Sequence, residues 1–133
     1  MIFLDLDDLL IIAERVLDGP AAVRDTGLLH AALARPQAAT GGRDAYPTIH
    51  EKAAALLHSL SRNPALVEGN KRLSLAGTIA FYGMNGYRLR MTNEAAFDLV
   101  ASVVAGNDDL QTTALLLKTA TVRPKQHGPS PRS

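Results

Sequence analysis

The sequence predicts a small all-α protein of about six helices. Most of the chain carries apolar residues at the three- and four-residue spacing of an amphipathic helix, and acidic or hydroxyl residues stand where these segments begin. Only residues 87–91 alternate apolar and basic side chains as a strand does. The 133 residues include no cysteine, which excludes disulfides, thiolate metal sites and cysteine nucleophiles, so helix packing must supply the stability.

The composition is that of one compact domain, with 47% hydrophobic and 20% charged residues. Three of the 14 basic side chains lie after residue 121 and none of the 13 acidic ones do, so residues 1–121 carry a net charge of −2. This balance argues against a general nucleic-acid or membrane binder. We expect a folded domain over residues 1–121 and a disordered, proline-rich basic tail over 122–133.

No apolar run is long enough for a membrane span, and the N-terminus carries acids where a signal peptide carries basic residues. We therefore expect a cytoplasmic protein that does not contact a membrane.

Two helices are expected in the first part of the chain. The first begins behind Asp5 and ends at Asp18-Gly19-Pro20, and the second follows Asp25-Thr26 and ends before Pro36. Residues 37–47 have no apolar period, which predicts a loop or small hairpin, called the flap below. The residues expected to face inward are Leu6, Leu9, Leu10, Ala13, Val16, Leu17, Leu28, Leu29, Ala32 and Leu33.

Thr48 and Glu51 form a capping box at the start of a third helix, which should end at Asn63-Pro64. Residues 70–84 are apolar around most of the helical wheel, which predicts a buried helix at the centre of the bundle. Asn85-Gly86 is a suitable left-handed stop for it. The stripe expected to be buried in the third helix is Ile49, Ala53, Leu56, Leu57 and Leu60.

Two more helices are expected over residues 93–105 and about 108–118. Arg88 and Arg90 should lie on the exposed edge of the short strand over residues 87–91, which precedes these two helices. The inward residues expected in the two helices are Ala96, Leu99, Val100, Val103 and Val104, then Leu110, Thr113, Ala114 and Leu117. Of the aromatic residues, Phe81 and Phe97 are expected in the core, and Tyr82 and Tyr87 in the core or at the lip of a site.

The segment Glu68-Gly69-Asn70-Lys71-Arg72 is chemically out of place, because two cations on the first turn of an apolar helix oppose its dipole by ~0.3–1 kcal/mol each. A bound anion would remove this cost. The free N–H groups of the helix start, a glycine that allows close approach, and the donors of Lys71 and Arg72 would together hold phosphate oxygens. Glu68 could hold a Mg²⁺ ion that bridges them.

A structural interpretation competes with this one. Asn70 would then cap the helix, Glu68 would offset the two cations, and Lys71 and Arg72 would lie in solvent. The segment is not a Walker A loop, which needs two glycines four residues apart followed by Lys-Ser/Thr.

Several motifs occur in order between residues 28 and 87, within a wider match that covers roughly residues 4–117. They are LLHAALARP at 28–36, YP at 46–47, EKAAALLHSL at 51–60, RN at 62–63, EGNKR at 68–72 and NGY at 85–87. In sequence and spacing they resemble the Doc branch of the Fic/Doc family, the "death on curing" toxins. The resemblance implies a small Fic fold of about six helices with the active site in the loop before the central helix. It also implies a Phd-type antitoxin with a disordered segment that folds on binding, and contact with nucleic acid only through that antitoxin.

An activity is implied as well. Members of this branch transfer phosphate from ATP–Mg²⁺ to a threonine of elongation factor Tu and so block translation, whereas AMP-transferring Fic enzymes usually have glycine at the position of Lys71. In the family motif, His-x-Phe-x-Asp/Glu-Gly/Ala-Asn-Lys-Arg, Glu68 matches the metal ligand. The residues that match the nucleotide-binding cradle are Gly69, Asn70, Lys71 and Arg72. Arg62 matches an arginine two residues before the motif histidine.

The chain departs from the motif at its catalytic histidine, which is replaced by Pro64, while Leu66 stands at the phenylalanine position and can still fill the core. Proline cannot accept a proton, so a general-base role typically worth ~10²–10⁴ in rate is vacant. His58 is expected to be structural or at the rim. His30 and His50 lack an acidic partner placed by the sequence, and His127 is in the tail.

Two hypotheses about function follow. The first is a toxin that acts as an ATP–Mg²⁺-dependent phosphotransferase, with residues 41–46 of the flap docking the target segment. The second is a catalytically impaired Fic-fold protein that acts by forming and regulating an antitoxin complex. A helical scaffold without a nucleotide site would require Lys71 and Arg72 to face solvent with no ligand.

Overall fold

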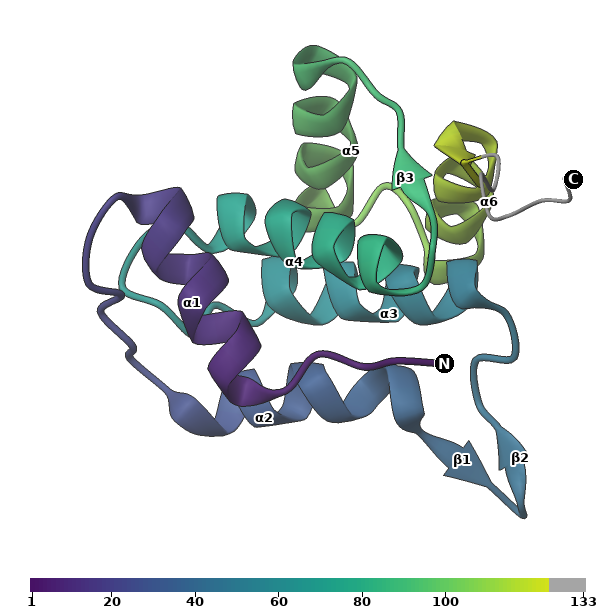
Figure 1. Cartoon of the computed structure of the whole chain (residues 1–133), viewed down its shortest axis with the longest axis horizontal. Helices are drawn as coiled ribbons and strands as arrows, with labels where there is room; N and C mark the ends of the chain where they lie inside the picture. The colour runs from purple at the N-terminus through teal and green to yellow at the C-terminus, as the bar shows by residue number, and fades with distance from the viewer. Residues whose placement is uncertain (125–133) are drawn as a thin grey trace, which may run out of the picture.

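Helix α3 (Ile49–Arg62) runs through the middle of the fold, with α2 (Thr26–Ala34), α4 (Asn70–Met84), α5 (Asn93–Ala105) and α6 (Leu110–Ala120) packed around it (Figure 1). The computed structural model describes residues 1–124. Eleven of the 14 residues of α3 are buried, which is possible because many of them are small. The small buried residues are Ala53, Ala54, Ala55, Ser59 and Ser61.

The remaining elements lie at the periphery. Helix α1 (Leu6–Leu17) packs on α4, and the 3-10 turn η1 (Arg35–Gln37) continues α2 toward a hairpin of β1 (Ala39–Thr40) and β2 (Arg43–Asp44). A second two-stranded antiparallel sheet joins β3 (Arg88–Leu89) to β4 (Thr121–Val122). The all-α, six-helix prediction and the hairpin in the flap are therefore confirmed.

Side-chain caps explain why the helix bounds follow the sequence so closely. Asp5 and Thr48 each form a capping box, in which the cap side chain accepts from the backbone N–H three residues on and that residue's side chain reaches back. Asp25, Thr92 and Asp109 cap α2, α5 and α6 by the same three-residue hydrogen bond. None of the six helices in the described residues is long and apolar enough to cross a bilayer.

The prediction that residues 70–84 form the central, wholly buried helix is wrong in one respect. The helix forms with these bounds, but Ile79 is 47% exposed and Met84 is 37% exposed, because neighbours cover only part of its circumference. The central position belongs to α3 instead. The polar residues Lys52 and His58, which suggest a solvent face in the sequence, are buried there at 4% and 5% exposure.

Three smaller expectations also fail. Phe97 is 65% exposed because α5 turns Ala96, Leu99, Val100 and Val103 inward and leaves position 97 on the outer face. Val104 is exposed for the same reason. Val122 pairs with Arg88 in the β3–β4 sheet, so the first residue assigned to the tail belongs to a strand. Residues 125–133, the rest of the predicted tail, lie outside the described part of the chain.

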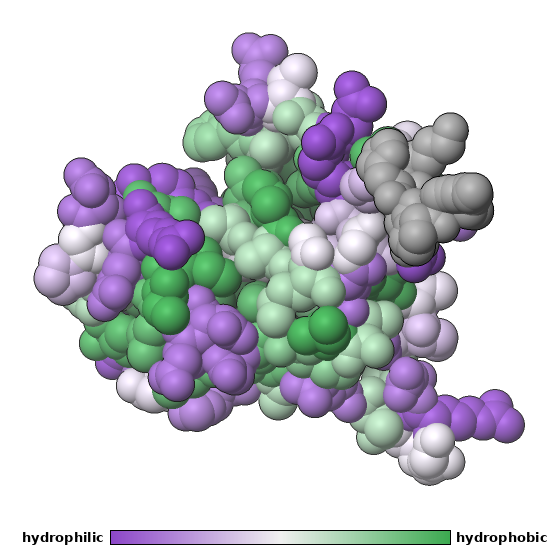
Figure 2. All heavy atoms as spheres, in the orientation of Figure 1, coloured by the Kyte–Doolittle hydropathy of each residue, from purple (hydrophilic) through white to green (hydrophobic). Residues whose placement is uncertain are grey.

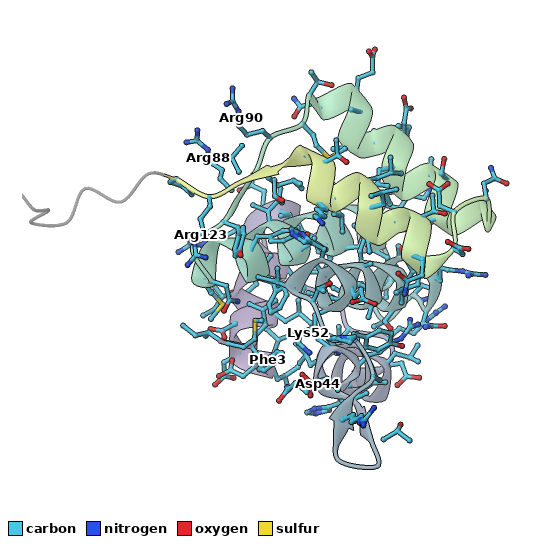
Figure 3. All side chains as sticks on the ribbon, turned by 90° about the vertical axis from the view of Figure 1, so that its right-hand side faces the viewer. Phe3, Asp44, Lys52, Arg88, Arg90 and Arg123 are labelled. Atoms are coloured by element: carbon cyan, nitrogen blue, oxygen red, sulfur yellow. The ribbon has the colours of Figure 1, made fainter. Side chains whose placement is uncertain are left out.

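The flap is anchored to α3 by two cations. Lys52 donates to Asp44 Oδ2 at 3.1 Å and to the carbonyl oxygen of Tyr46, forming the one ion pair found in the described residues (Figure 3). Arg35 lies over the Tyr46 ring at 5.5 Å and donates to its hydroxyl at 3.0 Å and to Ser59 Oγ at 3.2 Å. These contacts hold the base of the hairpin, while its four strand residues stay exposed.

Candidate functional site

The loop between α3 and α4 is tied to the segment between α1 and α2. Val23 and Leu66 form an isolated antiparallel bridge, and the Val67 N–H donates to the Ala22 carbonyl at 2.9 Å. The Ala65 carbonyl accepts two backbone N–H bonds from the same segment, at 2.7 and 3.0 Å. These hydrogen bonds pair the backbone polar groups of the loop and constrain its path.

Asn70 completes the fixation of this loop. Its Oδ1 accepts from the Leu66 N–H and its Nδ2 donates to the Leu66 carbonyl, both at 2.9 Å. The side chain therefore does not cap α4, whose N-cap residue is Gly69, and its amide is used within the loop. Leu66 is 1% exposed, so it does fill the core as expected of the residue at the motif's phenylalanine position.

Gly69 allows the chain to turn into α4. Its φ of +87° lies in the left-handed region, and a Cβ built there would lie 2.3 Å from Leu17 Cδ2. The Gly69 carbonyl accepts the Leu73 N–H at 2.9 Å as the first helical bond. The N–H groups of residues 70–72 precede this bond and have no acceptor within the helix, which leaves three donors at its positive end.

The two cations of the first turn have different environments. Arg72 donates from Nη1 to the Val16 carbonyl at 3.0 Å, so it caps the C-terminal end of α1, where the helix dipole favours a positive charge. Lys71 is exposed, and its ammonium group has no partner among residues 1–124. The structural interpretation expects both cations to lie in solvent. Lys71 fits that expectation, whereas Arg72 is exposed but also bonded to α1.

Glu68 is also exposed, and the described residues contain no group of three or more metal-ligating side chains. The loop can therefore offer Mg²⁺ a single carboxylate, which suits an ion held mainly by phosphate oxygens and water.

Pro64, at the position of the motif histidine, is exposed. Its carbonyl oxygen accepts a hydrogen bond from the Arg24 guanidinium group. The sequence analysis missed Arg24, since it lies 40 residues from Pro64 and belongs to no motif. Arg62 is the last residue of α3 and is exposed. Its positive charge therefore lies at the start of the loop, at the C-terminal end of the helix.

Two histidines do not replace the missing one. His58 is buried, with Nε2 at 2.8 Å from Thr113 Oγ1, and its burial together with nearby Arg35 and Arg62 lowers its pKa. It is a structural residue, as expected. His50 contacts the Tyr82 hydroxyl at 2.9 Å and lies 12 residues before Arg62 on the same helix, about 18 Å away along its axis. His30 is exposed on α2, and His127 lies outside the described residues.

The fold and this loop define a class of small helical proteins. In this class a glycine stands at the start of a long helix, and the first N–H groups of that helix are free to bind a ligand. The model of the Fic/DOC family matches residues 3–82. A protein named "Toxin Doc" from Mycolicibacterium smegmatis (strain ATCC 700084 / mc(2)155) is 46% identical over 114 residues, which cover 84% of this chain and 88% of that protein. The chain belongs to the Fic/Doc family.

The Gly69 geometry gives a stability prediction. Gly69→Ala should lower the free energy of unfolding by about 2–4 kcal/mol, because it adds backbone strain at a positive φ and a clash with Leu17. Gly83→Ala is the matched control, since it adds a methyl group to the same helix with nothing within 4 Å, and it should be neutral or stabilising by up to about 1 kcal/mol. Urea denaturation of both variants makes the comparison, and equal stabilities would contradict this account of the loop.

Proposed function

We propose that this chain is the toxin of a toxin–antitoxin pair and that it binds ATP–Mg²⁺ at the loop before α4. The observation that supports the nucleotide site is the fixed loop, with three N–H donors and the unpartnered Lys71 at its end. The similarity to a protein named Toxin Doc supports the biological role.

The residues of the loop fit a triphosphate in distinct ways. The N–H groups of residues 70–72 and the Lys71 ammonium would contact phosphate oxygens. Asn70 would contribute through its backbone, because its side chain is bonded to Leu66. Glu68 would hold Mg²⁺, and Arg72 would keep its bond to Val16 while offering its remaining N–H groups. When bound, ATP–Mg²⁺ supplies the phosphoryl group and the divalent charge.

Lys71→Ala should weaken binding of ATP–Mg²⁺ about 10- to 100-fold, since it removes a charge-assisted contact but no contact within the fold. Isothermal titration calorimetry measures the loss. Lys118→Ala, which removes an exposed lysine from α6, is the control and should bind as the unaltered protein does. Equal affinities for both variants would place the nucleotide elsewhere, and no binding by the unaltered protein would leave the scaffold interpretation.

The finer proposal is phosphotransfer to a threonine of elongation factor Tu, with the flap docking the target segment along its exposed strands. The threonine oxygen would form a bond to the γ-phosphorus as the bond to the β–γ bridging oxygen breaks, with ADP as the leaving group. Phosphoryl transfer depends mostly on positioning and charge, which the loop retains. Without an imidazole at position 64, the threonine proton must pass to water or phosphate, which makes the reaction slow.

A second candidate function rests on Pro64 itself. A Fic fold that keeps its loop but lacks the proton acceptor can act as a binding protein, by forming the antitoxin complex and regulating it. The two candidates differ in whether purified protein transfers phosphate to elongation factor Tu.

Pro64→His should create or raise phosphotransfer to elongation factor Tu, by up to about 10²–10⁴-fold if proton abstraction is the missing function. The exposed position should accept the change at a cost of about 0.4–1 kcal/mol through the unfolded chain. Transfer of labelled phosphate from ATP measures the rate, and Pro64→Ala is the control without an imidazole.

The double variant Pro64→His, Leu66→Phe tests whether the loop needs the motif's aromatic residue. Position 66 is buried and leaves little room for the larger side chain. If both variants fold and bind ATP but transfer nothing, while the unaltered protein is toxic on expression, the phosphotransfer proposal fails for this chain.

The antitoxin would bind apolar surface that the fold leaves uncovered. A band of apolar surface crosses the middle of the face in Figure 2, where Figure 1 places α4. Among the exposed apolar residues are Ile11 on α1 and Ile79 and Met84 on α4. We propose that a disordered antitoxin segment folds as an amphipathic helix over these two helices.

A neighbour-encoded antitoxin should co-purify with the protein and raise its melting temperature. At a free concentration about 100 times Kd the folded state gains about 2.7 kcal/mol, which corresponds to a shift on the order of 10 °C. Ile11→Asp should reduce the shift, whereas Leu115→Asp, at a position on α6 that is 63% exposed against 50% for Ile11, should not. An unchanged melt with every neighbour-encoded protein would argue against a toxin–antitoxin pair.

A further inference from the structure

Three arginines gather at one edge of the molecule, far from the loop before α4. Arg88 and its neighbour Arg90 come from β3 and the residue after it, and Arg123 follows β4. Figure 3 shows all three at the same edge of the molecule. This set of residues is called the basic edge below.

The positive charge of the basic edge is not neutralised within the described chain. No carboxylate of residues 1–124 lies within ion-pair distance of any of the three guanidinium groups. Residues 1–121 carry a net charge of −2, so the basic edge is a local exception to the charge of the body. The sequence after residue 124 adds Lys125 and Arg132 and no acid, so the chain does not carry its own counter-charge there.

An apolar hollow adjoins these charges. It has a volume of about 490 Å³ and is lined by Ile79, Gly83, Tyr87 and Leu89 together with Arg88 and Arg123. Ile79 is 47% exposed within it, and Arg123 lies over the Tyr87 ring at 5.2 Å. A second hollow of about 550 Å³ shares Arg88 and is lined by Arg90 and Met91. The surface therefore has two adjoining hollows, each lined by both arginine and apolar side chains.

Strand β3 also has an unused backbone edge. The Arg90 N–H donates to the Ala120 carbonyl at 2.8 Å, and Arg88 pairs with Val122 in the same register. In an antiparallel pair the intervening residue, Leu89, directs its N–H and C=O away from β4. Neither group has a partner among the described residues, so an extended chain could add to this edge through main-chain bonds.

We propose that the basic edge binds an extended, acidic peptide segment of a partner protein. The segment would pair with β3, place an apolar side chain in the hollow over Ile79, and put carboxylates against Arg88, Arg90 and Arg123. Charge complementarity and the β-strand edge select this occupant. A nucleic acid fits less well, because Arg123 covers a face of the Tyr87 ring that a base would need for stacking.

This surface is independent of the proposed nucleotide site. Ile79, the α4 residue of the hollow that lies nearest to Gly69 in sequence, is ten residues away, which is about 15 Å along the helix axis. A segment on the basic edge is extended, whereas the proposed antitoxin segment is helical. Both would contact Ile79, so the two segments would compete for that residue. Failure of the nucleotide proposal would therefore leave this one standing, and the reverse also holds.

The test uses the fluorescein-labelled peptide EDLEIDE with the full chain. Binding should perturb the amide resonances of residues 79–91 and 120–123 in ¹⁵N spectra, and fluorescence anisotropy should give a saturable affinity. Arg88→Gln, Arg90→Gln and Arg123→Gln should each weaken that affinity about tenfold. Arg43→Gln, which removes an exposed arginine from the flap, is the matched control and should bind normally.

The peptide EDSESDE, which keeps the charges but lacks the apolar side chains, should bind at least tenfold more weakly than EDLEIDE. The proposal is overturned if EDLEIDE causes no shifts at 1 mM, if the shifts lie elsewhere, or if Arg43→Gln weakens binding as much as Arg88→Gln. A uridine decamer that binds the same edge more tightly than the peptide would also overturn it and assign the surface to RNA.

Discussion

The burial of α3 on nearly all sides is the constraint from which the rest of the fold follows. A helix can be surrounded only if its side chains are small or find partners inside, and α3 meets both conditions. Its alanines let neighbours approach, Lys52 reaches Asp44 and Tyr46, and His58 bonds Thr113. Gly77 of α4 allows close contact from the other side, since a Cβ there would lie 3.2 Å from Leu60 Cδ1. The flap and the loop before α4 thus lie at opposite ends of the same buried helix, α3.

The loop depends on backbone pairing rather than on the residue at position 64. Its shape comes from the bridge between Val23 and Leu66, from the neighbouring bonds to the same segment, and from the Asn70 clamp. None of these contacts uses the Pro64 side chain, and its carbonyl bond to Arg24 is available to any residue. The conformation of the loop therefore does not depend on which side chain stands at position 64.

The helices could be predicted from sequence because their ends are marked locally, by Asp5, Asp25 and Thr48 among others. Their relative burial could not. Hydropathy treats Lys52 as a solvent-facing residue, and its actual partners depend on where the flap folds. In the site, Glu68 to Arg72 were found from their order in the chain, whereas Arg24 contacts the loop only through tertiary structure. The same limit explains Phe97, an aromatic residue whose position on α5 faces outward.

The two cations on the first turn of α4 differ in whether the fold compensates their charge. Each opposes the dipole of α4 by about 0.3–1 kcal/mol, but Arg72 recovers a similar amount at the C-terminal end of α1. Only Lys71 remains without a compensating partner in the described chain, and a cost of this size is one that a folded domain can tolerate. An anion at this loop would therefore be bound mainly by the backbone N–H groups and less by the two cations. A left-handed Gly69 and a clamped Leu66 hold three N–H groups in place before any ligand arrives, so binding an anion there requires little further ordering.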